Sequence, residues 1–334
     1  MRPVSKVTHA MKWLSTGLLF SAAAVSAKQV EVHDPVMTKE GDTYYVFSTG
    51  PGITYYESKD LTNWKLTGRV FKDEPSWAKR ISPSFDGHLW APDVYEKNGK
   101  FYLYYSVSAF GKNTSAIGVT VNETLDPSSP DYKWIDYGIV VESVPERDDW
   151  NAIDPAIIED ENGTPWMSFG SFWGGLKLVQ LDDDMVRLAK PEKWHHIASR
   201  PNTEHGPIEA PYIFKKNDYY YLFVSFDKCC RGVESTYNVR VGRSKNIEGP
   251  YLDQQGRSMV DGGGSLVIEG NKDWAALGHN AAYTFDGKDY LVLHAYETAD
   301  NGVQKLRILP MSWKNNWPVV NPADLNKLKT KLKK

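Results

Sequence analysis

One phrase recurs five times along the chain and limits the folds that the chain can adopt. Each copy contains a run of alternating apolar residues, a short turn, and a second run rich in aromatic residues that ends near serine. Self-similarity of this kind is typical of repeat proteins, in which every unit has the same local fold. The copies begin at His33, Trp90, Ile153, Glu209 and His279. The chain is therefore expected to build five equivalent units.

Each copy predicts a β-hairpin, because its two runs alternate as β-strands do and turn-forming residues separate them. These turns fall at residues 39–42, 97–100, 161–163, 216–218 and 286–288. The segments between copies are also β-rich and leave room for two more strands per unit. Four strands in each of five units predict an all-β fold, a five-bladed β-propeller with the active site on its central axis. A β-sandwich with long loops is the alternative, but a sandwich does not require five repeats of one sequence pattern.

Residues 1–27 have the order of a secretory signal peptide. Basic residues and no acidic ones come first, followed by a run of apolar and small residues and then Val25-Ser26-Ala27. The apolar run is shorter than the roughly 20 residues of a membrane-spanning helix, and no other segment could span a membrane. We therefore expect a mature protein of residues 28–334, a single catalytic domain that is secreted or periplasmic and not held in a membrane.

Charge and aromatic content limit the partners. Lys and Arg number 39 against 42 Asp and Glu, a net charge of -3, which argues against binding to nucleic-acid phosphates. The chain also has 12 Trp and 19 Tyr, whose exposed rings suit sugar rings.

The chain has two cysteines, and they are adjacent, Cys229 and Cys230. This spacing excludes a long-range disulfide framework and a zinc site. A vicinal disulfide and two free, buried thiols both stay open. At the C-terminus, leucines at helical spacing among lysines predict a solvated tail or a short closing helix.

The residues just before the anchoring position of each copy are expected to form one ring around the axis. The anchors are Pro35, Pro92, Pro155, Pro211 and, in the fifth copy, Ala281. A structural need shared by all blades would place one residue type in every copy, but the types diverge. Three blades supply a carboxylate, one a tryptophan and one a histidine: Asp34, Asp154, Glu209, Trp90 and His279. This pattern indicates an asymmetric site on a symmetric scaffold.

Several carboxylates beside an aromatic ring suit glycoside hydrolysis. One carboxylic acid protonates the leaving oxygen, and another carboxylate activates water or attacks carbon. A third carboxylate raises the pKa of the acid, because like charges repel. Structural roles stay open for single residues, since a strand-terminal Asp or Glu often caps a turn, Trp90 can pack between blades and His279 can be a polar core residue. His294, within a strand, is expected to be only a core residue.

The motifs of the chain resemble those of the arabinanases of glycoside hydrolase family 43. They are HDPVM, LWAPDV, SAIGVTVNETLDP, NAIDP, GSFW, IEAPY, CCRG, STYNVRVGRS and GHN. The resemblance covers essentially the whole mature chain, and the order of the motifs is more specific than any single one. It implies a five-bladed propeller that acts on α-1,5-linked L-arabinan.

The resemblance also implies an inverting mechanism with a role for each carboxylate. Asp34 would be the general base that activates water, Glu209 the general acid, and Asp154 the residue that raises the pKa of the acid and orients it. Inversion needs space for a water molecule, so Asp34 and Glu209 should lie roughly 6.5 to 9.5 Å apart.

Further site residues follow from the same resemblance. His279 would touch a calcium ion on the axis, although one protein ligand is sparse for an ion that prefers six to eight oxygens. No organic cofactor is implied. The positions that line the sugar subsites are Trp90, Phe110, Asn151, Ser171, Phe172 and Trp173. Phe110 and Trp173 could instead be core aromatics.

The leading hypothesis is thus an exported, endo-acting arabinanase that is a monomer and binds arabinan or arabino-oligosaccharides. An exo-acting arabinanase, a β-xylosidase or an α-L-arabinofuranosidase on the same fold is the nearest alternative. A non-catalytic sugar-binding propeller is the alternative from another class, but such a protein has no reason to keep all three carboxylates.

Overall fold

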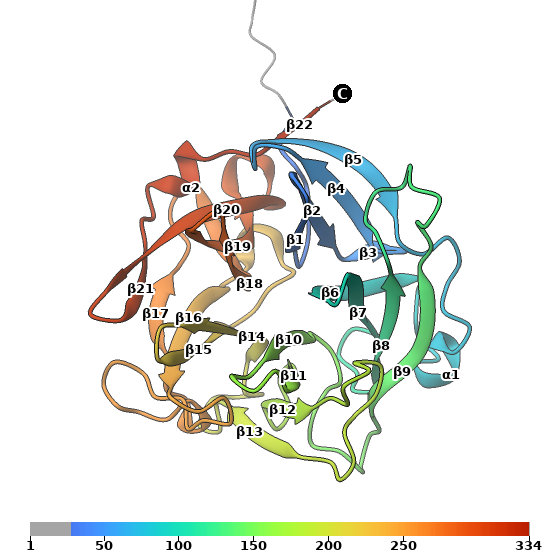
Figure 1. Cartoon of the computed structure of the whole chain (residues 1–334). Coiled ribbons are helices and arrows are strands. Elements are labelled where there is room, and N and C mark those ends of the chain that lie inside the picture. Colours follow the sequence, from blue (N-terminus) through green and yellow to red (C-terminus); the bar gives the residue numbers. More distant parts are fainter. Residues whose placement is uncertain (1–27, 334) are drawn as a thin grey trace, which may run out of the picture.

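Five β-sheets surround a common axis in the computed structural model, which describes residues 28–333 (Figure 1). The predicted five-bladed β-propeller is therefore confirmed. The predicted signal peptide at residues 1–27 lies outside the described residues. Within them, no helix is long and apolar enough to cross a membrane.

Each blade contains the four strands that the repeats predicted. Blade 1 contains β1 (Val36–Glu40), β2 (Thr43–Ser48), β4 (Thr54–Ser58) and β5 (Asn63–Arg69). Blade 2 contains β6 (His88–Lys97), β7 (Lys100–Val107), β8 (Ser115–Asn122) and β9 (Ile135–Ser143). Blade 3 contains β10 (Ala156–Glu159), β11 (Pro165–Phe169), β12 (Leu176–Gln180) and β13 (Trp194–Ala198). Blade 4 contains β14 (Ile208–Lys216), β15 (Tyr219–Phe226), β16 (Asn238–Ser244) and β17 (Ser265–Ile268). Blade 5 contains β18 (Trp274–Phe285), β19 (Lys288–Glu297), β20 (Val303–Lys314) and β21 (Trp317–Val320).

The first two strands of every blade form the predicted hairpin. In blade 2 the turn residues Asn98 and Gly99 have φ values of 55° and 73°. Two left-handed residues make a turn whose twist matches that of the flanking strands, which is why Asn-Gly is favoured there.

The remaining elements are short. Helix α1 (Ala78–Ile81) and the 3-10 turns η1 (Gly232–Glu234), η2 (Met259–Asp261) and η3 (Thr298–Asp300) lie in loops, and β3 (Gly50–Pro51) pairs with β6. Helix α2 (Asp324–Lys327) is the short closing helix that was one of the two expectations for the C-terminus, and it buries Leu325.

Both ends of the described chain meet at blade 1. Strand β22 (Lys331–Leu332) pairs in parallel with β5, and the backbone N–H of Leu332 donates to the carbonyl of Lys28. Glu31 forms a β-bridge with Lys305 of β20 in blade 5. The two termini therefore tie blade 1 to blade 5, and the sequence did not predict the last strand.

Apolar side chains fill the spaces between neighbouring blades. One buried cluster joins Phe47 and Tyr55 of blade 1 to Leu103 and Tyr105 of blade 2. Each such side chain contributes about 1.5 to 3 kcal/mol when it is fully buried. This packing fixes the blades relative to one another and so fixes the residues at the ends of their inner strands.

The fifth anchoring position is Asn280, and the prediction of Ala281 was wrong by one residue. A β-bulge between Gly278 and Ala281 matches the bulges between Trp90 and Asp93 and between Glu209 and Tyr212. This alignment also fits the backbone, because one residue of each copy has a left-handed φ between 42° and 59°: Asp34, Ala91, Asp154, Ala210 and His279. The fifth copy has Asn280 where the other copies have proline, so an alignment by residue type has no marker at this position.

Candidate active site

A cavity of about 740 Å³ lies where the inner strands of several blades converge. All the residues that the sequence singled out for the site line this cavity: Asp34, Trp90, Phe110, Asn151, Asp154, Ser171, Phe172, Trp173, Glu209 and His279. They come from blades that are distant in sequence, so the propeller alone brings them together. Their chemical roles remain predictions.

Side chains from one blade bind the backbone of the next blade at the residues that surround the central axis. The hydroxyls of Thr49, Ser106 and Ser225 accept the backbone N–H groups of Ala91, Asp154 and His279, respectively. In the fifth blade, Nδ1 of His294 accepts the N–H of Asp34 at 3.1 Å. These bonds fix left-handed residues that are otherwise unfavourable for an L-amino acid.

Asp34 is buried and held by three partners. Its Oδ1 lies 2.8 Å from Nδ1 of His33 and 3.1 Å from Nδ1 of His279, and its Oδ2 accepts a 2.5 Å hydrogen bond from the hydroxyl of Thr49. Burial by itself would raise the pKa of Asp34, but the histidines His279 and His33 outweigh burial and lower it far below the ordinary value. Asp34 is therefore ionised, as a carboxylate that activates water must be.

The pKa values of the three histidines around Asp34 shift in different directions. Burial lowers the pKa of His33, but the charge and hydrogen bond of Asp34 outweigh burial and raise it. Burial lowers the pKa of His279, and burial together with the charge of His33 lowers that of His294 well below its usual range. His33 is thus the ring of the three that carries positive charge most readily.

Glu209 is buried between two hydroxyls. Ser171 Oγ donates to its Oε2, and the Tyr237 hydroxyl donates to its Oε1, each at 2.6 Å. Burial raises the pKa of Glu209, and the two hydroxyls oppose this without cancelling it. A carboxyl that keeps its proton above the usual pH range is suited to act as a general acid.

Asp154 is also buried, and its Oδ2 accepts the backbone N–H of Ala210 at 3.1 Å. Burial raises the pKa of Asp154 well above its ordinary value, and the charges of Glu209 and Asp34 raise it further. The charge on Glu209 therefore opposes ionisation of Asp154, and the two carboxyls titrate as a pair.

Aromatic side chains line the same cavity as the three buried carboxyls. Phe110 is 83% exposed and Trp173 is 42% exposed, so neither is a core aromatic. Phe172 and Trp173 have left-handed φ values of 54° and 41° in the loop between β11 and β12. Asn151 is buried, and its Oδ1 accepts a 2.6 Å hydrogen bond from Ser115. Exposed rings around buried carboxyls form a surface that suits sugars.

The side chains around His279 do not form a calcium cage of protein oxygens. Its Nδ1 faces Asp34, which leaves one ring nitrogen for an ion. Among residues 28–333, the groups compact enough to hold a metal are His33 with Asp34 and His294, and His33 with Cys229 and Cys230. Neither includes His279, and both are rich in nitrogen or sulfur, whereas calcium prefers oxygen. An ion at His279 would depend on water for most of its ligands.

Sequence comparison missed several residues of the site. His294 was expected to be only a core residue, and it is fully buried, but it also holds the backbone of Asp34. Its place in the repeat is the signal that could have revealed it, since His294 stands where Ser106 and Ser225 stand in other copies. Thr49 fills the same role in blade 1, whereas no repeat signal marks Tyr237.

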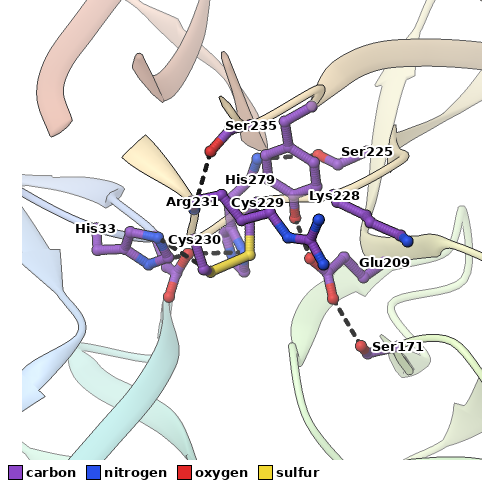
Figure 2. Close-up of a disulfide and its surroundings, with 12 residues drawn as sticks. His33, Ser171, Glu209, Ser225, Lys228, Cys229, Cys230, Arg231, Ser235 and His279 are labelled. Carbon is purple, nitrogen blue, oxygen red and sulfur yellow. Dashed lines mark hydrogen bonds and ion pairs between the residues drawn. A yellow bond between two sulfur atoms is a disulfide. The ribbon is translucent and has the colours of Figure 1, made fainter. Parts of the chain in front are cut away.

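Cys229 and Cys230 form a vicinal disulfide, which decides between the two states that the sequence left open. The disulfide lines the same cavity as the carboxyls. Figure 2 shows it between His33 and Glu209 in that view.

Known proteins resemble the chain over most of its length. The extracellular exo-α-(1→5)-L-arabinofuranosidase ArbA of Cellvibrio japonicus is 62% identical, over 97% of this chain and 96% of its own. The extracellular endo-α-(1→5)-L-arabinanase 1 of Bacillus subtilis is 42% identical, over 91% of this chain and 94% of its own. The solved structure of Cellvibrio cellulosa α-L-arabinanase complexed with arabinohexaose matches with a TM-score of 0.90 at 62% identity, covering 92% of this chain and 100% of that one. The model of glycosyl hydrolases family 43 matches residues 27–318, so the chain belongs to glycosyl hydrolases family 43.

Proposed function

We propose that this protein is secreted and hydrolyses α-1,5-linked L-arabinan with inversion at the anomeric carbon. The observation that carries the proposal is the pair of opposite pKa shifts in one cavity, with that of Asp34 lowered and that of Glu209 raised. A site that keeps one carboxylate ionised and another protonated has the two groups of a glycosidase, an acid and a base or nucleophile, and the resemblance of the motifs to the arabinanases favours inversion. The two relatives named extracellular support secretion.

In the proposed reaction, Asp34 accepts a proton from a water molecule as the water oxygen attacks the anomeric carbon. Glu209 donates its proton to the glycosidic oxygen as the bond from that oxygen to the anomeric carbon breaks. Because repulsion between two carboxylates is mutual, we assign Asp154 the role of raising the pKa of Glu209, and it also fixes the neighbouring backbone through Ala210. Water adds to one side of the sugar and the leaving group departs from the other, so the configuration inverts.

Two modes of action remain candidates. The motifs of the sequence favour endo action, which cuts within the arabinan chain. The 62% identical relative named as an exo-acting arabinofuranosidase favours release from a chain end, whereas the 42% identical relative is named as an endo-arabinanase. The two modes require different cavity shapes, because an exo-acting site must close beyond the last sugar that it binds.

The test is the product ladder released from linear α-1,5-arabinan by the purified mature protein. A mixed ladder of short oligomers from the first minutes supports endo action, and one short product throughout supports exo action. Glu209→Gln should abolish product release. Glu161→Gln, in an exposed hairpin turn, should leave the amount and the length of the products unchanged. Tight binding of arabinan without release of any product would overturn the proposed enzymatic activity and favour a non-catalytic sugar-binding propeller. NMR of the first product tests inversion directly.

Calcium at His279 is a separate prediction. Titration calorimetry with CaCl₂ on chelator-treated protein should show binding to the wild type that His279→Ala removes. Equal binding by the two proteins, or none by either, would contradict a site at this histidine. The monomeric state is likewise predicted, and sedimentation velocity tests it.

A further inference from the structure

The vicinal disulfide belongs to the wall of the substrate cavity. Cys230 is exposed, Cys229 is half-buried, and both line the cavity that holds Asp34 and Glu209. The same cavity is lined by exposed apolar surface from other blades, at Phe110 and Trp173. The two sulfur atoms of blade 4 thus join Phe110 and Trp173 as apolar surface in the cavity that contains the buried carboxyls.

A disulfide between adjacent residues does little for global stability. A disulfide stabilises a fold mainly by closing a loop of the unfolded chain, and the gain grows with loop length. The sequence separation of Cys229 and Cys230 is 1, so the bond closes no such loop.

The loop that carries the disulfide is already held by other bonds. The N–H of Thr236 donates to the carbonyl of Lys228 at 2.9 Å, and the N–H of Arg231 donates to the hydroxyl of Ser235 at 3.0 Å. Gly302, from the loop that follows η3 in blade 5, fits so tightly that an added Cβ would lie 2.4 Å from the backbone of Gly232. The disulfide is therefore not the only contact that holds this loop among the described residues.

Cys230 touches two other blades at the mouth of the cavity. Its Sγ lies 3.7 Å from Nε2 of His33 in the segment before β1, and its N–H donates to the Tyr296 hydroxyl of β19 at 2.8 Å. These contacts fix the direction in which the sulfur surface faces. Figure 2 shows the disulfide with His33, His279 and Glu209 around it.

We propose that the Cys229–Cys230 disulfide is a substrate-contacting surface that packs on the apolar C–H face of a bound arabinofuranose ring. Sulfur is polarisable and apolar, and a disulfide-linked pair presents it with little rotational freedom. A furanose ring has few C–H groups on each face, so a narrow rigid patch suits it better than a flexible side chain. This inference rests on the proposed function, because it assigns a residue pair to the recognition of the same substrate.

The test compares Cys229→Ser/Cys230→Ser with the wild type on linear arabinan and on a short arabino-oligosaccharide. The KM of the double variant should rise about threefold to tenfold, the range that one polarisable contact supplies, while kcat changes less than about twofold. The thermal midpoint should hold within about 2 °C, because no loop closure is lost. The matched control is Val233→Ser, which alters an exposed apolar residue of η1 that does not line the cavity.

A second measurement removes the ambiguity of a damaged variant. Wild-type protein treated with a phosphine reductant, which takes up oxygen from water and leaves two thiols, should show the same rise in KM, with thiol titration confirming reduction. Calorimetry with the oligosaccharide on Glu209→Gln, with and without the two serines, should show the same loss of affinity.

The outcomes separate the proposals. An unchanged KM in active protein would overturn the contact role and leave the hydrolase intact. A fall in kcat at constant KM would also overturn it, because the disulfide would then act through His33 on Asp34. A wild type that releases no sugar from arabinan would refute the proposed function itself.

Discussion

The hydroxyl of Tyr237 donates a 2.6 Å hydrogen bond to Oε1 of Glu209, inside a site where burial raises the pKa of that carboxyl. Tyr237 is fully buried against β18, and its own pKa is raised by burial and by the charge of Glu209. The hydroxyl therefore stays protonated and stabilises the ionised form of the acid. It also fixes the direction in which Glu209 points.

Replacing Tyr237 by Phe should shift the basic limb of the kcat/KM profile to higher pH. Without the donor, the ionised form of Glu209 loses a stabilising bond, so its pKa rises further and the acid keeps its proton longer. The shift should be about one pH unit, since a hydrogen bond to a charged group contributes about 1.5 to 3 kcal/mol before water replaces part of it. A pH–rate series tests this, and Ser171→Ala should move the limb in the same direction. A limb that stays in place in both variants would contradict the role of these donors.

Asp154→Asn should move the same limb to lower pH. The charge of Glu209 raises the pKa of Asp154. Because that repulsion is mutual and an amide cannot carry charge, the variant should lose the repulsion that opposes ionisation of Glu209, and the pKa of Glu209 should fall. Because the two carboxyls titrate as a pair, the upper apparent pKa of the wild type belongs to both, and the variant should show a single lower value. We expect kcat at neutral pH to fall by about tenfold or more, as the protonated fraction of Glu209 shrinks. An unchanged limb with a reduced kcat would assign Asp154 to positioning alone.

Asp34→Asn should lower kcat by about 10² to 10⁴-fold, the range of general base catalysis, with KM little affected. Thr49→Val should produce a smaller loss, because the carboxylate keeps its histidine partners but loses the hydroxyl on Oδ2. Steady-state kinetics on arabinan separates the two, and circular dichroism checks that both fold. Activity in Asp34→Asn close to that of wild type would remove Asp34 from the chemistry.

Gly278→Ala should destabilise the fold and reduce activity together. A Cβ at position 278 would lie 2.2 Å from the ring of Tyr237, far closer than side-chain carbons approach. Overpacking of this kind costs about 1 to 3 kcal/mol and would push Tyr237 away from Glu209. Urea unfolding and kcat report the two effects. Gly287→Ala is the matched control for folding with no neighbour within 4 Å, although its left-handed φ of 74° adds a local cost.

The repeats of the sequence contained enough information for the blades and for the identity of the main site residues. The alternation of apolar residues in hairpins and the Asn-Gly turns depend on a few neighbouring residues, so they can be recognised in the sequence alone. The divergence of residue types at equivalent positions singled out Asp34, Asp154 and Glu209 for the same reason, since it compares short segments directly. All three line one cavity.

The support of the site could not be predicted in the same way. The hydroxyl of Tyr237 and the imidazole of His294 bond to carboxyl or backbone groups that are distant in sequence. Such contacts depend on how neighbouring blades pack. The equivalent position of the fifth blade, Asn280, also needed the strand register, because this copy lacks the proline that marks the others. The pairing of β22 with β5 likewise joins opposite ends of the chain.

The sequence by itself determined a five-bladed propeller, its hairpins and the three carboxyls, because local periodicity and repeat comparison carry that information. Only the tertiary structure decided the directions in which the pKa values of those carboxyls shift and the oxidised state of Cys229 and Cys230. A pKa depends on burial and on charges brought from other blades, and a disulfide depends on the geometry of one loop. Neither quantity is a property of a residue and its neighbours in the chain.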